Sequence, residues 1–174
     1  MRRIGVINGN AELAACFFNM KHGKLISFSG GRSSAMMLKI MLDNGMVDAN
    51  TVVAFANTGK EREETLEFVR DCGEAFGVKI WWVEYIPEKP LYRIVDFDTA
   101  SRSGEPFEAL TRRAKYLPNA VQRICTGDLK IKPINRLMKK ELGFSGYVKY
   151  MGIRADELSR YLKLKDTAEM PLFD

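Results

Sequence analysis

A single stretch, residues 25–34, constrains the fold of this chain more than any other. Residues 25–28 are mostly apolar and predict a short strand, and residues 34–44 predict a helix with Gly45 as its C-terminal cap. Residues 29–31 include two adjacent glycines, which permit positive φ and let backbone N–H groups approach a ligand closely. A strand, a glycine-rich turn and a helix N-terminus together form a cradle for anions, usually phosphate. The stretch therefore predicts a nucleotide-binding protein, and a tight turn without a ligand is the alternative.

Length and composition fit one globular domain. The chain has 174 residues, of which 46% are hydrophobic and 28% charged, and no apolar run approaches the roughly 18 residues of a membrane span. Residues 1–8 carry basic side chains but no long apolar segment, so no signal peptide is predicted. We therefore expect one cytoplasmic domain over residues 1–174, without membrane contact. The net charge of +5 suits polyanionic partners such as nucleotides and nucleic acids.

Cysteine and histidine are too sparse for most metal and nucleophile chemistry. The three cysteines, Cys16, Cys72 and Cys125, show no C-x-x-C spacing, so neither a disulfide framework nor a local zinc site is predicted. His22 is the only histidine, which excludes most Ser–His, Cys–His and His–metal mechanisms. We expect it at the surface near a helix end.

Strands and helices alternate in the first half of the chain. Further elements are predicted there: a helix over 10–21, a strand over 51–56, a helix from about 58 to 76 and a strand over 78–85. Thr58 and Glu61 fit a capping box at the start of the second of these helices. This alternation implies right-handed crossovers and a parallel sheet. Ligands bind beyond the carboxyl ends of such strands, where the loops that begin at Ser29 and Asn57 both lie.

The second half is less regular. Residues 87–106 hold three prolines and predict a binding loop or lid. A short helix is predicted over 105–115, a longer one over 128–142 and a strand over 146–151. The expected fold is α/β, an open, Rossmann-like parallel sheet of about five strands with helices on both faces.

The loop Ser29-Gly-Gly-Arg-Ser-Ser34 is neither a Walker loop nor a G-x-G-x-x-G fingerprint. It resembles the Ser-Gly-Gly-x-Asp-Ser loop of the N-type ATP pyrophosphatases, the PP-loop group that includes the PAPS reductases. The sequence departs from that motif at Ser33, where the family has Asp. Three more segments extend the resemblance: 55–59 with Glu64-Thr65, 123–126 with 129–133, and 152–154 with Asp156, Glu157 and Arg160. Together they resemble phage- and prophage-type PAPS-reductase-like proteins, and they imply the adenine nucleotide alpha hydrolase-like fold.

The resemblance also implies a site. Arg32, Lys130 and Arg154 are its candidate catalytic residues, because a triphosphate with roughly four negative charges requires cations. The nucleotide-binding candidates are Ser27, Ser29, Gly30, Gly31, Arg32, Ser33, Ser34, Asn57, Thr58, Gly59, Cys125, Thr126, Gly152, Ile153, Arg154, Glu157 and Arg160. We expect Mg²⁺ to be held by phosphate oxygens, with Asp156 or Glu157 in place of the missing loop Asp. No site in which side chains alone hold a metal is predicted.

The implied activity is attack at the α–β phosphate bond of ATP or a related adenine nucleotide, which adenylates an unknown second substrate and releases pyrophosphate. PAPS reduction is the runner-up. It is disfavoured because no cysteine follows Cys125, and the ending suggests a truncated or shortened member. A nucleotide sensor without turnover stays open because of Ser33, and assembly with a second copy of the chain stays open too.

A nucleic-acid-binding module is the non-enzymatic alternative, through Arg112, Arg113, Lys115 and the basic residues of 130–140. The simpler interpretation of that basic stretch is a solvated helix face. Trp81 and Trp82 lie in a predicted strand, where a place in the core is favoured over an adenine-stacking role.

Overall fold

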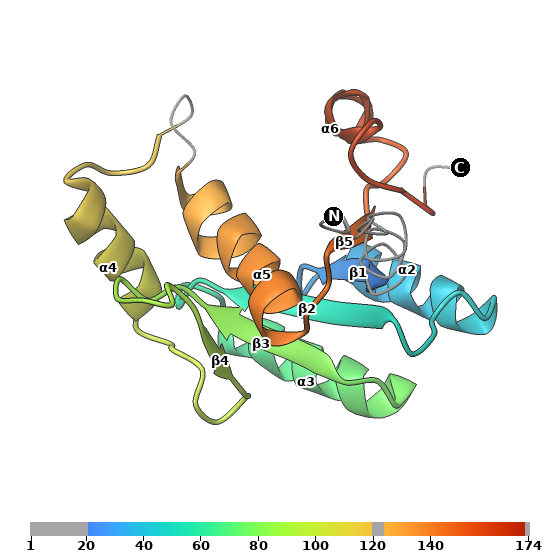
Figure 1. Ribbon diagram of the computed structural model, residues 1–174, viewed down its shortest axis with the longest axis horizontal. Coiled ribbons are helices and arrows are strands. Elements are labelled where there is room, and N and C mark those ends of the chain that lie inside the picture. The colour runs from blue at the N-terminus through green and yellow to red at the C-terminus, as the bar shows by residue number, and fades with distance from the viewer. Residues whose placement is uncertain (1–20, 120–123, 173–174) are drawn as a thin grey trace, which may run out of the picture.

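The computed structural model describes residues 21–119 and 124–172 (Figure 1). The first half contains β1 (His22–Phe28), α2 (Arg32–Asp43), β2 (Thr51–Asn57), α3 (Glu63–Phe76), β3 (Ile80–Glu84) and β4 (Arg93–Val95). The second half contains α4 (Glu105–Ala114), the π-helical η1 (Cys125–Ile131), α5 (Lys132–Arg136), the π-helical η2 (Leu137–Glu141), β5 (Gly146–Met151) and α6 (Leu158–Leu164). The helix predicted over 10–21, together with Cys16 and Arg123, lies outside the described residues.

The strands form one open sheet in the order β4-β3-β2-β1-β5. Strand β1 pairs in parallel with β2 and β5, and β2 pairs in parallel with β3. The expected open α/β fold with about five strands is therefore confirmed. One strand departs from the prediction, because β4 runs antiparallel to β3. The sequence before β4 is a short, proline-containing loop, and a loop of that kind returns the chain along the same edge rather than across the sheet.

Helices cover both faces of the sheet because β1 and β2 are apolar on both sides. Leu25 packs with the residues of α5 and η2, whereas its neighbour Ile26 packs with those of α2 and α3. Successive side chains of a strand point to opposite faces, so each strand contributes to two cores. Figure 1 shows α5 and α3 on opposite sides of the sheet. No helix in the described ranges is long and apolar enough to span a membrane.

Several predicted boundaries were wrong. Helix α3 begins at Glu63, after the N-cap Arg62, so Thr58 and Glu61 form no capping box. Instead, the Thr58 hydroxyl donates to the Glu61 carboxylate within the loop. The helix predicted over 128–142 is already formed at Ile124, the first described residue of this range, and it contains two π-helical stretches, Cys125–Ile131 and Leu137–Glu141. Strand β4 and helix α6 were missed because each is short and lacks a clear periodicity.

Trp81, Trp82 and His22, whose positions were predicted from the sequence, lie only partly where we expected them. Trp82 is buried and its ring meets that of Phe55 edge to face, with centroids 5.0 Å apart. Trp81 is half-buried, with the ammonium of Lys79 3.5 Å from its ring centroid. His22 is exposed, as predicted, but it begins strand β1 rather than lying near a helix end.

Candidate functional site

The loop between β1 and α2 has the shape that an anion cradle requires. Gly30 has a φ of +76°, and a Cβ there would lie 2.7 Å from the methyl group of Thr65, so only glycine fits. The buried Ser34 Oγ accepts hydrogen bonds from the Ser29 N–H and the Ser29 hydroxyl, both at 3.1 Å, and donates to the Gly31 carbonyl at 2.8 Å. Helix α2 follows an N-cap, Gly31, that has no side chain to cap it. The N–H groups of its first turn therefore point toward whatever acceptor enters the loop.

The segment after β5 lies directly against this loop. A Cβ on Gly152 would lie 2.9 Å from the Ser33 carbonyl oxygen and 3.0 Å from the Ser34 Cα, so the two backbones are in contact. This contact brings Arg154 beside Arg32, and both side chains line one hollow of about 260 Å³. Segments about 120 positions apart in the sequence thus place two guanidinium groups at the N-terminus of α2.

The cations of this segment are held by its own carboxylates. Arg154 grips Asp156 through two hydrogen bonds of 2.9 and 2.7 Å, and Arg160 pairs with Glu157, which also accepts the Arg154 N–H at 3.1 Å. The Arg154 guanidinium lowers the pKa of Asp156 below its usual range. The pKa of Glu157 is lowered too, mainly by the hydrogen bond from the Arg154 N–H and secondly by the one from the Arg160 side chain. All of these side chains lie at the surface or half-buried, so an anionic ligand can displace the carboxylates.

The loop after β2 is held by a buried polar network. The Asn57 carbonyl oxygen accepts the Gly59 N–H at 3.0 Å, and the Asn57 amide donates to Glu84 at 2.7 Å and to the Ser101 carbonyl at 2.8 Å. Glu84 also accepts the Ser101 N–H at 2.6 Å, the Ser101 hydroxyl at 2.9 Å and two Arg93 bonds of 2.9 and 2.7 Å. Both Asn57 and Glu84 are 0% exposed. Every bonding position of this buried carboxylate is occupied, which fixes the loop.

Sequence reasoning missed Glu84 as a part of the site. The signal was present, because Glu84 is the one charged residue in the apolar strand β3, and a charge in a buried strand requires partners. Its partners, Arg93 at the start of β4 and Ser101 in the following loop, lie in the stretch that the sequence predicted to be irregular, so they could not be assigned before the fold placed them.

A hollow with mainly apolar walls lies on the α5 face of the same strand ends. It has a volume of about 130 Å³, and its walls include Ser27, Met151 and Leu164. Lys130 also lines it, and the Lys130 ammonium lies 3.3 Å from Glu61. The hollow therefore offers a mainly apolar surface next to a charged side chain.

The remaining predicted residues have mixed positions. Ile153 is buried in the core, and Cys125 is half-buried against the cluster of Tyr85 and Leu129. Neither Cys125 nor the exposed Thr126 lines either of the two hollows described above. Within residues 21–119 and 124–172, no group of three or more His, Cys, Asp or Glu side chains is placed to hold a metal ion.

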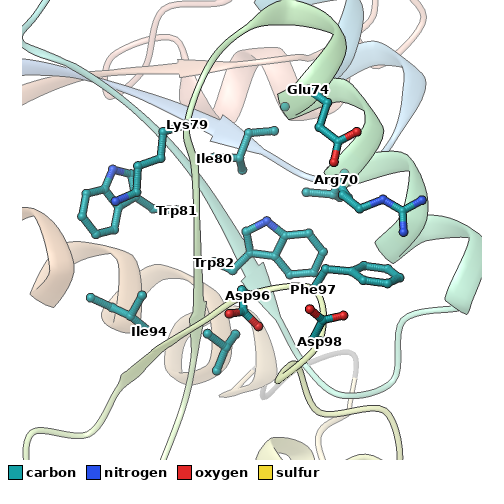
Figure 2. Close-up of a pocket in the computed structure, with 13 residues that line it drawn as sticks. Arg70, Glu74, Lys79, Ile80, Trp81, Trp82, Ile94, Asp96, Phe97 and Asp98 are labelled. Atoms are coloured by element: carbon teal, nitrogen blue, oxygen red, sulfur yellow. The ribbon is translucent and has the colours of Figure 1, made fainter.

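A larger hollow of about 560 Å³ lies at the other edge of the sheet, between α3 and the β3–β4 pair (Figure 2). Its cations are already engaged, because Lys79 lies across the Trp81 ring and Arg70 lies 4.3 Å from the centroid of Phe97. Carboxylates such as Glu74 share the same walls, and no glycine-rich loop opens into it. This hollow therefore lacks the glycine-rich turn and the uncapped helix N-terminus of the loop after β1.

Comparison with known proteins relates the chain to a phage protein. Over 150 residues it is 31% identical to "Uncharacterized nin region protein ORF290" of Escherichia phage lambda. The match includes 78% of this chain and 49% of the phage protein, so the chain spans about half the length of that relative. No family model matches the chain. The name of this relative states no activity.

Proposed function

We propose that this protein binds ATP or a related adenine nucleotide at the carboxyl ends of β1, β2 and β5, and that it acts at the α–β phosphate bond. The observation that carries the proposal is the loop after β1: an uncapped helix N-terminus, a glycine that no other residue can replace, and two arginines at its rim. Backbone N–H groups and arginines together are the usual ligands of a polyphosphate. The resemblance of the sequence to PAPS-reductase-like proteins supports the same assignment.

The hollows suggest how the nucleotide lies. The adenosine occupies the apolar hollow beside Ser27 and Lys130, and the phosphates follow the loop from Ser29 to the hollow of Arg32 and Arg154. When the nucleotide binds, Arg154 leaves Asp156 and pairs with a phosphate oxygen, and Lys130 leaves Glu61 and does the same. Each exchange keeps the cation paired with an anion and releases the displaced carboxylate, Asp156 or Glu61, from its ion pair.

Catalysis would rest on positioning and charge stabilisation. Arg32, Lys130 and Arg154 neutralise charge that develops on the phosphates, and a second substrate supplies the attacking group. Mg²⁺, bound through the phosphate oxygens, would neutralise further charge, and Asp156 and Glu157 become free to approach it once their arginines turn to the ligand.

Thermal unfolding with Mg-ATP, PAPS and Mg-GTP tests binding. At about 100 times its dissociation constant, a ligand adds about 2.7 kcal/mol, which raises the Tm of a protein of this size by roughly 5–10 °C. We expect this shift with ATP but not GTP, and we expect Arg32→Gln to reduce it. Arg112→Gln, an exposed arginine of α4, is the matched control and should keep the full shift. No shift with any nucleotide contradicts the proposal.

Two outcomes distinguish the alternatives. A shift with PAPS alone favours sulfonucleotide chemistry over ATP chemistry. ATP binding without pyrophosphate release, assayed with candidate acceptors, favours a sensor, and pyrophosphate release that appears only in Ser33→Asp would identify Ser33 as the cause.

A further inference from the structure

Residues 130–140 have a charge pattern that differs from an ordinary surface helix. They contain five lysines and arginines and no carboxylate. Ile134, Leu137 and Met138 of this segment are buried against the sheet, which turns the charged side chains outward. Exposed helices normally mix both signs of charge, because pairs of opposite sign at i,i+4 stabilise them. The two carboxylates of the same helical stretch, Asp128 and Glu141, lie only at its ends, so positive charge is concentrated between them.

Four of these cations gather around one hollow. Lys132, Arg136, Lys139 and Lys140, here called the basic surface, line a depression of about 230 Å³ together with Asn135. Lys132 is paired with Asp128 at 2.7 Å. In the described part of the chain, no carboxylate lies within ion-pair distance of the other three cations.

The opposite side of the sheet has the opposite charge. Helix α3 carries five carboxylates and one arginine, and Figure 1 shows it across the sheet from α5. An asymmetric distribution of this kind orients a polyanion toward the basic side and repels it from the acidic side. The basic surface adjoins the proposed nucleotide site, because Asn135 lines both its depression and the apolar hollow, but its four cations do not line that hollow, and Lys130 turns toward Glu61.

We propose that the basic surface binds the phosphate backbone of a nucleic acid. From Lys132 to Lys140 the helical rise is about 12 Å, and one strand of DNA places a phosphate about every 3.4 Å along the axis. The surface therefore faces about three to four phosphates of one strand. Contacts to phosphates alone carry no sequence information, so the binding is independent of base sequence.

The test uses fluorescence anisotropy with labelled 20-nucleotide single- and double-stranded DNA at salt concentrations from 50 to 200 mM. Four neutralised phosphates give a slope of log affinity against log salt of about −2.8 for single strands and about −3.6 for duplex DNA, which is roughly a 50- to 150-fold loss over this range. Lys139→Gln/Lys140→Gln should make the slope less negative by roughly 1.4–1.8. The control is Lys163→Gln/Lys165→Gln, which removes the same charge from exposed positions at the end of α6 and should keep the slope.

Three outcomes overturn the proposal. They are no binding at 50 mM salt, an equal loss in both double variants, and complete displacement of the DNA by Mg-ATP. The second outcome indicates an effect of net charge alone, and the third places the DNA phosphates in the nucleotide site. Retained binding in the presence of Mg-ATP, with a slope that changes only in Lys139→Gln/Lys140→Gln, supports it. The result does not depend on whether the protein binds ATP.

Discussion

The loops that follow β2 and β5 border the same candidate site but are held in different ways. The loop after β2 depends on Glu84 and Asn57, which are fully buried and fully hydrogen-bonded. The segment after β5 is held by the pairs Arg154–Asp156 and Arg160–Glu157 at the surface. Buried polar groups are costly to leave unpaired, whereas exposed ion pairs contribute little. The first loop is therefore a fixed wall, and the second can rearrange around a ligand.

Removal of the buried carboxylate should have the largest effect. Glu84→Ala leaves Asn57, Ser101 and Arg93 without their shared acceptor. We expect a loss of about 3 kcal/mol, the lower end for breaking a buried pair because Arg93 is half exposed. That loss corresponds to a fall in Tm of roughly 6–12 °C in thermal unfolding. Glu88→Ala, at an exposed position in the loop after β3, is the control, and an equal fall in both variants contradicts the network's importance.

The contact between the β5 segment and α2 should come next. Gly152→Ala places a Cβ 2.9 Å from the Ser33 carbonyl oxygen, so one of the two backbones must move. We expect a loss of about 2 kcal/mol, or roughly 4–8 °C in Tm, and a smaller nucleotide-induced shift. Gly127→Ala is the matched control, because a Cβ there meets nothing within 4 Å. If both variants unfold at the wild-type temperature, the two segments are not tightly packed.

Release of Arg154 should change ligand binding without changing stability. Asp156→Asn removes an exposed partner, so the Tm of the free protein should stay within error of wild type. The freed guanidinium should then bind phosphate more readily, which increases the shift produced by a subsaturating concentration of Mg-ATP. Asp166→Asn, also exposed and near the end of α6, should behave as wild type. A smaller ATP shift in Asp156→Asn would show instead that Asp156 contributes to the bound state.

Hydrogen exchange compares the two loops without any substitution. The N–H groups of Gly59 and Ser101 donate to buried oxygens and should exchange slowly. The Arg154 N–H donates to Glu157 at the surface and should exchange faster, because local opening there exposes little buried surface. Mass spectrometry or NMR in the absence of nucleotide measures both. Equal protection of the three amides would remove the distinction between a fixed and an adaptable loop.

Much of the fold followed from local patterns. Residues 52–56 are apolar on both faces, as a central parallel strand requires, and β5 has the predicted bounds Gly146–Met151. Gly77 ends α3 in the left-handed conformation expected of a helix C-cap. These features depend on neighbouring residues only, so the sequence order alone reveals them. The short strand β4 depends on the sheet edge that β3 provides, and no local pattern predicted either β4 or the short helix α6.

In the candidate site, too, some features follow from local sequence and others only from the tertiary structure. The sequence by itself determined the glycine-rich turn, because Gly30, between a strand and a helix, can adopt the positive φ that this turn requires. Only the tertiary structure brought Arg154 to Arg32 and closed the network around Glu84, whose partners lie 9 to 27 positions away. Turns are decided by backbone sterics within a few residues. Ion pairing and burial are decided by which strand ends become neighbours in the sheet.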